Sequence, residues 1–304
     1  MADVISGEPL VGEERIAPAN GIELAYEELG DPSGQPMVLI MGLAAQMIFW
    51  PDELCELLGE RGYRVIRFDN RDIGHSTMID SAGVPPNGAM MLGYGRPAYR
   101  LSDMAADTVG LLDHLQVERA HLVGASMGGM IAQQVAIDHP ERSLSLCSIM
   151  SSSGNRRHRL PSWRAFAALM AKPPRTRDAA IEAAVKTFRL VGSPGYEFDE
   201  ARFRELVGRA FDRGHRPAGI ARQLHAINCS GNRTAALRRL ELPTLVIHGS
   251  RDPLVRPGAG RQVAKVVPGA QLKMYEGMGH DLPVALYADF AREIDENARR
   301  AGSS

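Results

Sequence analysis

The sequence predicts an α/β fold, a mostly parallel sheet flanked by helices, with a helical block inserted into it. Two observations lead to this prediction. Short apolar segments alternate with longer helical patterns over residues 1–153 and again over 237–304, whereas residues 154–236 show no strand-like segment. Strands that alternate with helices form mostly parallel sheets with right-handed crossovers. A helical block between two strands of one sheet is typical of a cap over the sheet edge.

Strand patterns recur at regular intervals. Residues 22–28 alternate apolar and polar side chains, as a half-buried strand does, and 36–41 (PMVLIM) are continuously apolar, as in a strand buried on both faces. Apolar spacing at three and four predicts a helix over 101–115, with Ser102 as its N-cap. The other expected strands are 63–68, 120–123, 144–150, 242–248 and 272–275; the other helices are 51–61, 127–138, 261–267 and 284–299.

The inserted block is rich in Arg and predicts helices at 163–172, 177–190, 199–212 and 220–227. We therefore expect a core of residues 1–153 and 237–304 and a helical cap of residues 154–236. The alternative is a second independent domain. The strand pattern resumes after the block, which favours the cap.

Composition restricts the function classes. The chain has 304 residues, a formal net charge of −1 and a pI near 6.8, so neither sign of charge predicts a nucleic-acid or anionic-membrane partner. Three widely spaced cysteines without a C-x-x-C predict neither a disulfide framework nor a zinc site. The N-terminus lacks the pattern of a signal peptide, and no apolar segment is long enough to span a bilayer. We expect a cytoplasmic protein; its oligomeric state stays open, a homodimer included.

A nucleophile is predicted at Ser126. Residues 124–128 read GASMG and match G-x-S-x-G. The motif follows an apolar strand and opens a helix, which is the setting it requires. Its glycines allow a tight, strained turn around the serine, and the helix N-terminus favours developing negative charge.

A serine hydroxyl needs a base, and the base needs an acid to orient it. Among nine histidines, His280 lies in a Gly-rich loop directly after the last strand, at the sheet edge where ligands bind. Asp252 lies in the preceding strand-end loop. Asp281 is adjacent to His280 and poorly placed for the far ring nitrogen, and Asp69 is a weaker candidate. The order Ser126, Asp252, His280 is the one this architecture uses.

Acyl transfer also needs donors for the oxyanion. One expected donor is the backbone N–H of Met127, just after the nucleophile. The other should come from the loop after residues 36–41, at Gly42 and Leu43, and we favour the N–H of Leu43.

Five segments resemble the α/β-hydrolase superfamily along nearly the whole chain: PMVLIMGLAAQ (36–46), VIRFDNRDIGHS (65–76), LVGASMGGMIAQQVAIDHPERSLSL (122–146), PTLVIHGSRDPLV (243–255) and EGMGHDLP (276–283). MG after the third strand, together with FDNRDIGHS, resembles bacterial carboxylesterases related to aclacinomycin methylesterase. The resemblance implies an eight-stranded sheet, Ser126 as nucleophile, Asp252 as acid, His280 as base, and Leu43 and Met127 as oxyanion donors. Relatives often have His at the position of Met41, which leaves a backbone donor unaffected.

The predicted activity is cleavage of carboxylic esters through an acyl-enzyme, on small to medium apolar substrates, with no cofactor and no metal. A lactonase, thioesterase, perhydrolase or carbon–carbon bond hydrolase would use the same three residues. A non-catalytic ligand receptor on this fold is an alternative of another class, and slow turnover with tight ligand binding would favour it. Epoxide hydrolases and haloalkane dehalogenases have a carboxylate nucleophile in this turn. The serine at position 126 excludes their route.

Substrate binding is expected from Gly42 and from one helix face in the cap. Trp163, Phe166 and Met170 recur at three and four, so they share a face. That face either lines a pocket above Ser126 or packs on the rest of the cap, and the sequence leaves both open.

Overall fold

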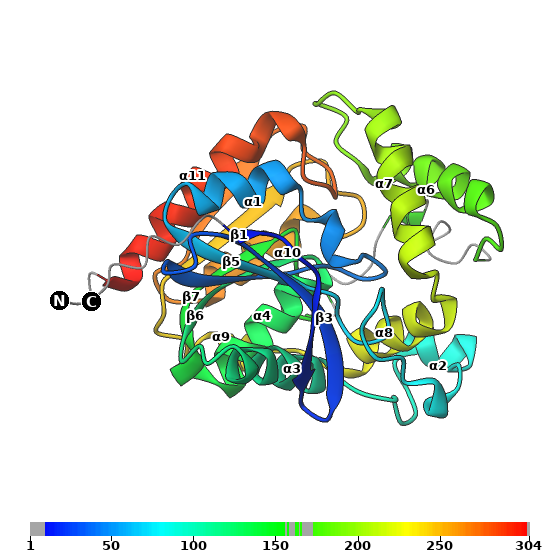
Figure 1. Cartoon of the computed structure of the whole chain (residues 1–304), viewed down its shortest axis with the longest axis horizontal. Helices are drawn as coiled ribbons and strands as arrows, with labels where there is room; N and C mark the ends of the chain where they lie inside the picture. Colours follow the sequence, from blue (N-terminus) through cyan, green and yellow to red (C-terminus); the bar gives the residue numbers. More distant parts are fainter. Residues whose placement is uncertain (1–9, 156, 158–161, 164, 166–172, 303–304) are drawn as a thin grey trace.

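One sheet organises the chain (Figure 1). In this computed structural model the described residues are 10–155, 157, 162, 163, 165 and 173–302. Within them, nine strands form a sheet of order β1-β3-β5-β4-β6-β7-β8-β9, with β2 paired to β3. The strands are β1 Leu10–Val11, β2 Arg15–Ala19, β3 Ile22–Gly30, β4 Gln35–Ile40, β5 Tyr63–Phe68, β6 Ala120–Ala125, β7 Ser143–Ile149, β8 Thr244–Gly249 and β9 Gln271–Tyr275.

The six strands from β5 across β4, β6, β7 and β8 to β9 are parallel, and β3 joins β5 antiparallel. Met37, Val38, Leu39 and Ile40 of β4 are all fully buried, as a strand covered on both faces requires. The predicted mostly parallel sheet is therefore confirmed.

Helices cover both faces. α1 and α11 pack on one face and α3, α4 and α10 on the other, each with its own apolar cluster. The helices are α1 Asp52–Gly59, α2 Asn87–Leu92, α3 Leu101–His114, α4 Met127–Asp138, α6 Arg177–Val191, α7 Glu200–Gly214, α8 Pro217–Cys229, α9 Thr234–Leu237, α10 Pro257–Val266 and α11 Tyr287–Arg299.

The predicted N-cap of α3 is wrong. The helix begins at Leu101, after Arg100, and the Asp103 carboxylate accepts the backbone N–H of Arg100 at 2.7 Å. Ser102 is thus the second residue of the helix. The carboxylate of the third helical residue thus accepts the backbone N–H of the residue before the helix, which is the role of the N3 side chain in a capping box.

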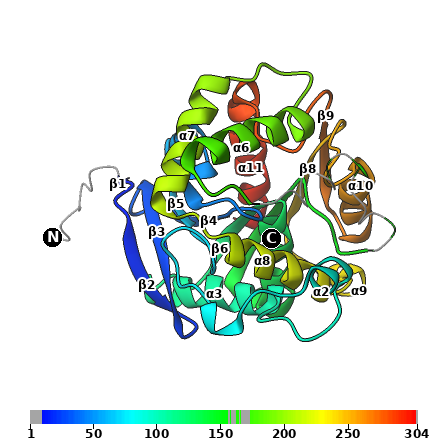
Figure 2. The same ribbon diagram turned by 90° about the vertical axis from the view of Figure 1, so that its right-hand side faces the viewer.

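Three helices of the inserted block correspond to predicted ones. They are α6, α7 and α8, which lie between β7 and β8 in the chain and above the carboxyl edge of the sheet (Figures 1 and 2). α6 packs on α7, and α8 packs on α2. The short helix α2 was not predicted from the sequence. The expected helix 163–172 lies mostly outside the described residues. The division into a core and a cap of residues 154–236 stays a prediction.

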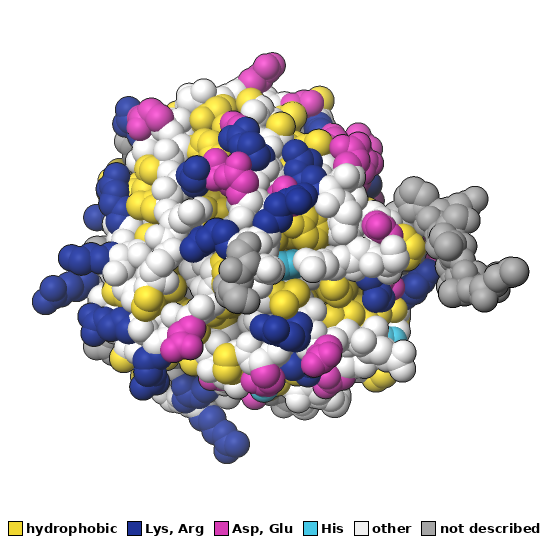
Figure 3. All heavy atoms as spheres, turned by 90° about the vertical axis from the view of Figure 1, so that its left-hand side faces the viewer, with side chains coloured by type: hydrophobic (Ala, Val, Ile, Leu, Met, Phe, Trp, Pro, Cys, Tyr) yellow, Lys and Arg dark blue, Asp and Glu magenta, His cyan; other side chains and the backbone are white. Residues whose placement is uncertain are grey.

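The surface drawn in Figure 3 mixes both signs of charge. Lys and Arg side chains alternate there with Asp and Glu, and hydrophobic side chains form small groups between them. In the described part of the chain, no helix is long and apolar enough to cross a membrane.

Candidate active site

Ser126 lies at a sharp turn between β6 and α4. Its backbone has φ 55° and ψ −116°, a conformation that costs an L-residue about 1–3 kcal/mol. Both flanking glycines are required by close contacts. A Cβ on Gly124 would lie 2.2 Å from the Gly128 carbonyl oxygen, and one on Gly128 would lie 1.9 Å from that of Ile40. The turn therefore exposes the serine hydroxyl at the end of the strand.

The three residues expected to act together meet in the structure. His280 Nε2 lies 2.9 Å from Ser126 Oγ, and His280 Nδ1 lies 2.7 Å from Asp252 Oδ2. Asp252 is 3% exposed. Its other oxygen, Oδ1, accepts the backbone N–H groups of Leu254 and Val255 at 2.8 and 2.9 Å. This carboxylate is thereby held with one oxygen free to orient the imidazole.

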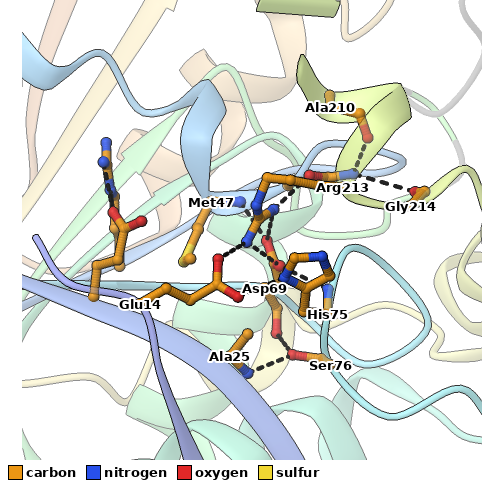
Figure 4. Close-up of polar contacts among 12 residues, drawn as sticks. Glu14, Ala25, Met47, Asp69, His75, Ser76, Ala210, Arg213 and Gly214 are labelled. Atoms are coloured by element: carbon orange, nitrogen blue, oxygen red, sulfur yellow. Dashed lines mark hydrogen bonds and ion pairs between the residues drawn. The ribbon is translucent and has the colours of Figure 1, made fainter. Parts of the chain in front are cut away.

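The other two candidate acids have different partners. Asp281 accepts a hydrogen bond from Ser193 Oγ and lines the cavity described below; burial raises its pKa to about 6. Asp69 is fully buried and pairs with Arg213 at 3.0 Å; Figure 4 shows the Arg213 guanidinium joined to both Asp69 and Glu14. Neither carboxylate hydrogen-bonds the His280 ring in the described part of the chain, as expected for Asp281.

The loop that carries His280 is fixed by the segment after α6. The His280 backbone N–H donates to the Val191 carbonyl at 2.7 Å. A Cβ on Gly279 would lie 2.2 Å from the Gly192 carbonyl oxygen. A Cβ on Gly277 would lie 2.8 Å from Gly195 Cα, and one on Gly195 would lie 2.7 Å from Gly277 Cα. The base is thus held by a close backbone contact with the inserted block.

The expected oxyanion donors lie beside the nucleophile. Met127 is the first residue of α4, where a backbone N–H has no partner within the helix. A Cβ on Gly42 would lie 3.1 Å from Ser126 Cβ, so this loop passes directly against the serine. Gly42, Leu43 and Met127 line the same cavity as Ser126.

Gln223 of α8 holds this loop from the other side. Its Oε1 accepts the backbone N–H of Ala44 at 3.2 Å, and its Nε2 donates to the Arg71 carbonyl at 2.8 Å. Ala44 has φ 64°, a left-handed conformation that needs support in a non-glycine residue. The fully buried Gln223 amide thus supports the loop that carries Leu43.

His248 lies behind the acid. Its Nε2 donates to the Val255 carbonyl at 2.7 Å and is 3.5 Å from Asp252 Oδ2. Burial lowers the pKa of this histidine, so it is neutral at physiological pH. It supports the Asp252 loop and does not contact Ser126.

A cavity of about 1180 Å³ lies over Ser126 and His280, between the sheet edge and the inserted helices. Its wall includes the side chains Phe49, Phe188, Phe198, Phe203 and Phe211. Trp163 is 75% exposed and is absent from the described lining, while Phe166 and Met170 lie outside the described residues. Their role in substrate binding stays a prediction, without support from the position of Trp163. No group of three or more potential metal ligands occurs among the described side chains.

Sequence reasoning missed Gln223, Ser193 and His248. Gln223 and Ser193 contact residues more than 80 positions away, so no local motif reveals them. The position of His248 could have been recognised from the sequence. It lies four residues before Asp252, at the end of a fully buried strand.

Comparisons with known proteins agree with this fold. A family model described as the alpha/beta hydrolase fold matches residues 35–284. Rhodomycin D methylesterase DnrP of Streptomyces peucetius is 33% identical, over 94% of this chain and 98% of that protein. The putative carbamate hydrolase RutD of Variovorax paradoxus is 30% identical, over 89% and 94%. The crystal structure of a hydrolase from Pseudomonas aeruginosa PA01 has a TM-score of 0.70 and 25% identity, over 97% of this chain and all of that one.

Proposed function

We propose a mechanism and a substrate class from one premise: this chain belongs to the α/β-hydrolase family and is a carboxylesterase-type hydrolase. The predicted resemblance to bacterial methylesterases is confirmed by the relatives. The proposal is that Ser126, His280 and Asp252 cleave carboxylic esters in two steps. The observation that carries it is the continuous hydrogen-bonded chain from Ser126 Oγ through His280 to the buried Asp252.

In the first step, Ser126 Oγ attacks the ester carbonyl carbon while His280 Nε2 takes its proton. Asp252 stabilises the resulting imidazolium. The backbone N–H groups of Leu43 and Met127 stabilise the negative oxygen of the tetrahedral intermediate. The C–O bond to the alcohol then breaks, and His280 returns the proton to the leaving alkoxide, which leaves an acyl-enzyme.

In the second step, water attacks the acyl carbonyl while His280 again accepts a proton. Collapse of this intermediate releases the acid and restores the Ser126 hydroxyl. No step requires a cofactor.

The substrate we propose is a small to medium ester with apolar parts. Support comes from the five phenylalanines in the cavity wall and from the volume of about 1180 Å³. We further propose that residues 154–236 form the cap that covers this cavity. Lactones, thioesters and carbon–carbon bonds remain alternatives, because the same three residues serve them. The name of the methylesterase relative favours an ester.

The test is Ser126→Ala, assayed with p-nitrophenyl butyrate. We expect a loss of about 10⁴-fold or more in kcat, because the nucleophile is gone, with an unchanged melting temperature. Ser151→Ala is the matched control: it removes a hydroxyl 2.7 Å from the Ser126 carbonyl oxygen, outside the reacting groups. A loss below tenfold in Ser126→Ala would contradict the proposal. A parallel panel of lactones and thioesters separates the rival hydrolases, and tight ester binding with slow turnover would favour a receptor.

A further inference from the structure

Arg233 lies in the wall of the cavity and is only 5% exposed. It precedes α9, and its backbone N–H donates to the Ser153 carbonyl at 2.8 Å. Its guanidinium makes two hydrogen bonds, from Nε to Gln133 Oε1 at 3.3 Å and from Nη2 to the Ser152 carbonyl at 2.8 Å. Both acceptors are neutral, so the charge itself is not compensated by them.

Other buried arginines of this chain have an acid. Arg222 pairs with Asp72 at 2.6 Å and Arg71 with Asp107 at 2.5 Å. Arg233 makes no ion pair in the described part of the chain. A guanidinium has five N–H donors, and three of those on Arg233 have no acceptor there.

The sequence between Glu141 and Asp178 contains no acid that could pair with Arg233. Eight Arg or Lys occur there: Arg142, Arg156, Arg157, Arg159, Arg164, Lys172, Arg175 and Arg177. Asn155, Pro173 and Pro174 of this stretch line the cavity. Burial lowers the pKa of Arg233 to about 10, which still leaves the side chain charged at neutral pH.

Arg233 is held on the elements that present the nucleophile. Gln133 belongs to α4, the helix that starts directly after Ser126. Ser152 follows Ser151, whose hydroxyl donates to the Ser126 carbonyl at 2.7 Å. Arg233 and Ser126 also line the same cavity.

A buried charge without a partner is costly, and it is retained where a ligand neutralises it. Arg is suited to this because its planar fork binds a carboxylate through two parallel hydrogen bonds. We propose that Arg233 forms a carboxylate subsite, and that the preferred substrates are esters that carry a second, ionised carboxyl group, such as monoesters of dicarboxylic acids. This inference rests on the proposed esterase function.

The rival explanation is structural: Arg233 would tie the segment before α9 to Gln133 and Ser152. The two explanations differ in substrate dependence. A subsite discriminates between a carboxylate-bearing ester and its neutral analogue, whereas a structural tie affects both equally.

The experiment compares ethyl hydrogen succinate, glutarate and adipate with ethyl esters of unsubstituted acids of equal chain length, by proton release at constant pH. For the wild type we expect kcat/KM to favour the carboxylate-bearing ester at one chain length by about tenfold or more. In Arg233→Met that preference should fall by about 10- to 100-fold, since a charged hydrogen-bond pair is lost. Hydrolysis of ethyl pentanoate should fall by at least about tenfold less than hydrolysis of the carboxylate-bearing ester, and Arg233→Lys should keep part of the preference.

Folding is controlled separately. Melting temperatures are measured for each variant, and inhibition of wild-type ethyl pentanoate hydrolysis by glutarate is compared with inhibition by neutral glutaramide. The subsite predicts inhibition by glutarate alone. A wild type with no preference and no such inhibition would overturn the inference, as would an Arg233→Met variant that loses both substrates equally.

Failure of the proposed function gives a different result. In that case the wild type hydrolyses neither ethyl pentanoate nor the carboxylate-bearing esters. Glutarate binding to Ser126→Ala by calorimetry then still tests the subsite, because it requires no turnover. Absence of binding there overturns the inference by itself.

Discussion

The proposed catalytic triad and the seam beneath the inserted helices are both polar and both buried, but they are assembled differently. The triad residues each follow a strand of the core. The seam, by which we mean the contacts of Arg213, Arg222 and Gln223 with the core, joins residues 139 to 199 positions apart. Figure 4 shows one end of it, where Arg213 meets Asp69.

The difference separates chemistry from stability. In the triad, the orienting acid keeps other partners when His280 is replaced. Asp252 retains two backbone donors. In the seam, removal of an arginine leaves a buried carboxylate without its ion-pair partner, and removal of Gln223 leaves two backbone groups unpaired. Both losses lower the free energy of unfolding. Substitutions in the two regions should therefore affect different measurements.

The largest effect is expected for Asp252→Asn. Asparagine keeps an oxygen for the backbone donors of Leu254 and Val255 but presents an amide to His280 Nδ1, which favours the wrong tautomer. We expect kcat to fall by about 10⁴-fold with little change in melting temperature. Asp281→Asn is the matched control and should stay within about threefold. A reversed pair of results would identify Asp281 as the orienting acid.

The second effect should appear in stability alone. Arg222→Met leaves Asp72 buried with only Tyr99 Oη and the Ile79 backbone N–H as donors. We expect a loss of about 3–5 kcal/mol in urea unfolding, with kcat of the folded protein within about threefold. The double variant Arg222→Met/Asp72→Asn should recover part of the loss, because no charge remains unpaired. A large fall in kcat of Arg222→Met at unchanged stability would contradict the separation of the seam from catalysis.

Gln223 connects the two regions, so its replacement should affect both. Gln223→Leu leaves the Ala44 N–H and the Arg71 carbonyl without partners and should lower stability by about 1–3 kcal/mol. Because the same loop carries Leu43, kcat should fall more than KM changes. Gln223→Glu is the control, since it still accepts the Ala44 N–H and should retain more of kcat. Equal kcat in all three proteins would show that the loop does not depend on α8.

The smallest effect concerns pH. Burial raises the pKa of Asp281 from its ordinary range to about 6, so the folded protein binds this proton more tightly than the unfolded chain. The wild type should therefore lose stability as pH rises from about 4 to 6, by on the order of 1 kcal/mol after solvent screening. Asp281→Asn removes this loss. Unfolding at several pH values should show the variant gaining relative stability up to pH 6 and none above; parallel curves would contradict the assignment.

Local patterns predicted most of the fold. Residues 63–68 and 127–138 coincide with β5 and α4. Gly62 precedes the strand, and the G-x-S-x-G turn and His139–Pro140 bound the helix. The same holds for the three site residues, each of which follows a strand pattern. α2 has only six residues, too few for a periodic signal, and it is stabilised by packing on α8.

The seam had no such signal. Arg222 and Gln223 look like ordinary polar residues of an amphipathic helix, and only the folded chain shows that they are 2% and 0% exposed. Their partners, Asp72 and Ala44, lie in loops whose conformation depends on that contact. Long-range polar pairs of this kind are decided by tertiary packing, which single-sequence patterns do not contain.

The contact between the His280 loop and the segment after α6 has a consequence for protein engineering. Gly277 and Gly279 interlock with Gly195 and Gly192 at distances that admit no side chain. In a chimera that received only the inserted helices of a relative, the relative's segment would have to pack against the original His280 loop. We expect such a chimera to be active only when residues 277–281 are exchanged together with the helices. The exchangeable unit therefore consists of two segments rather than one.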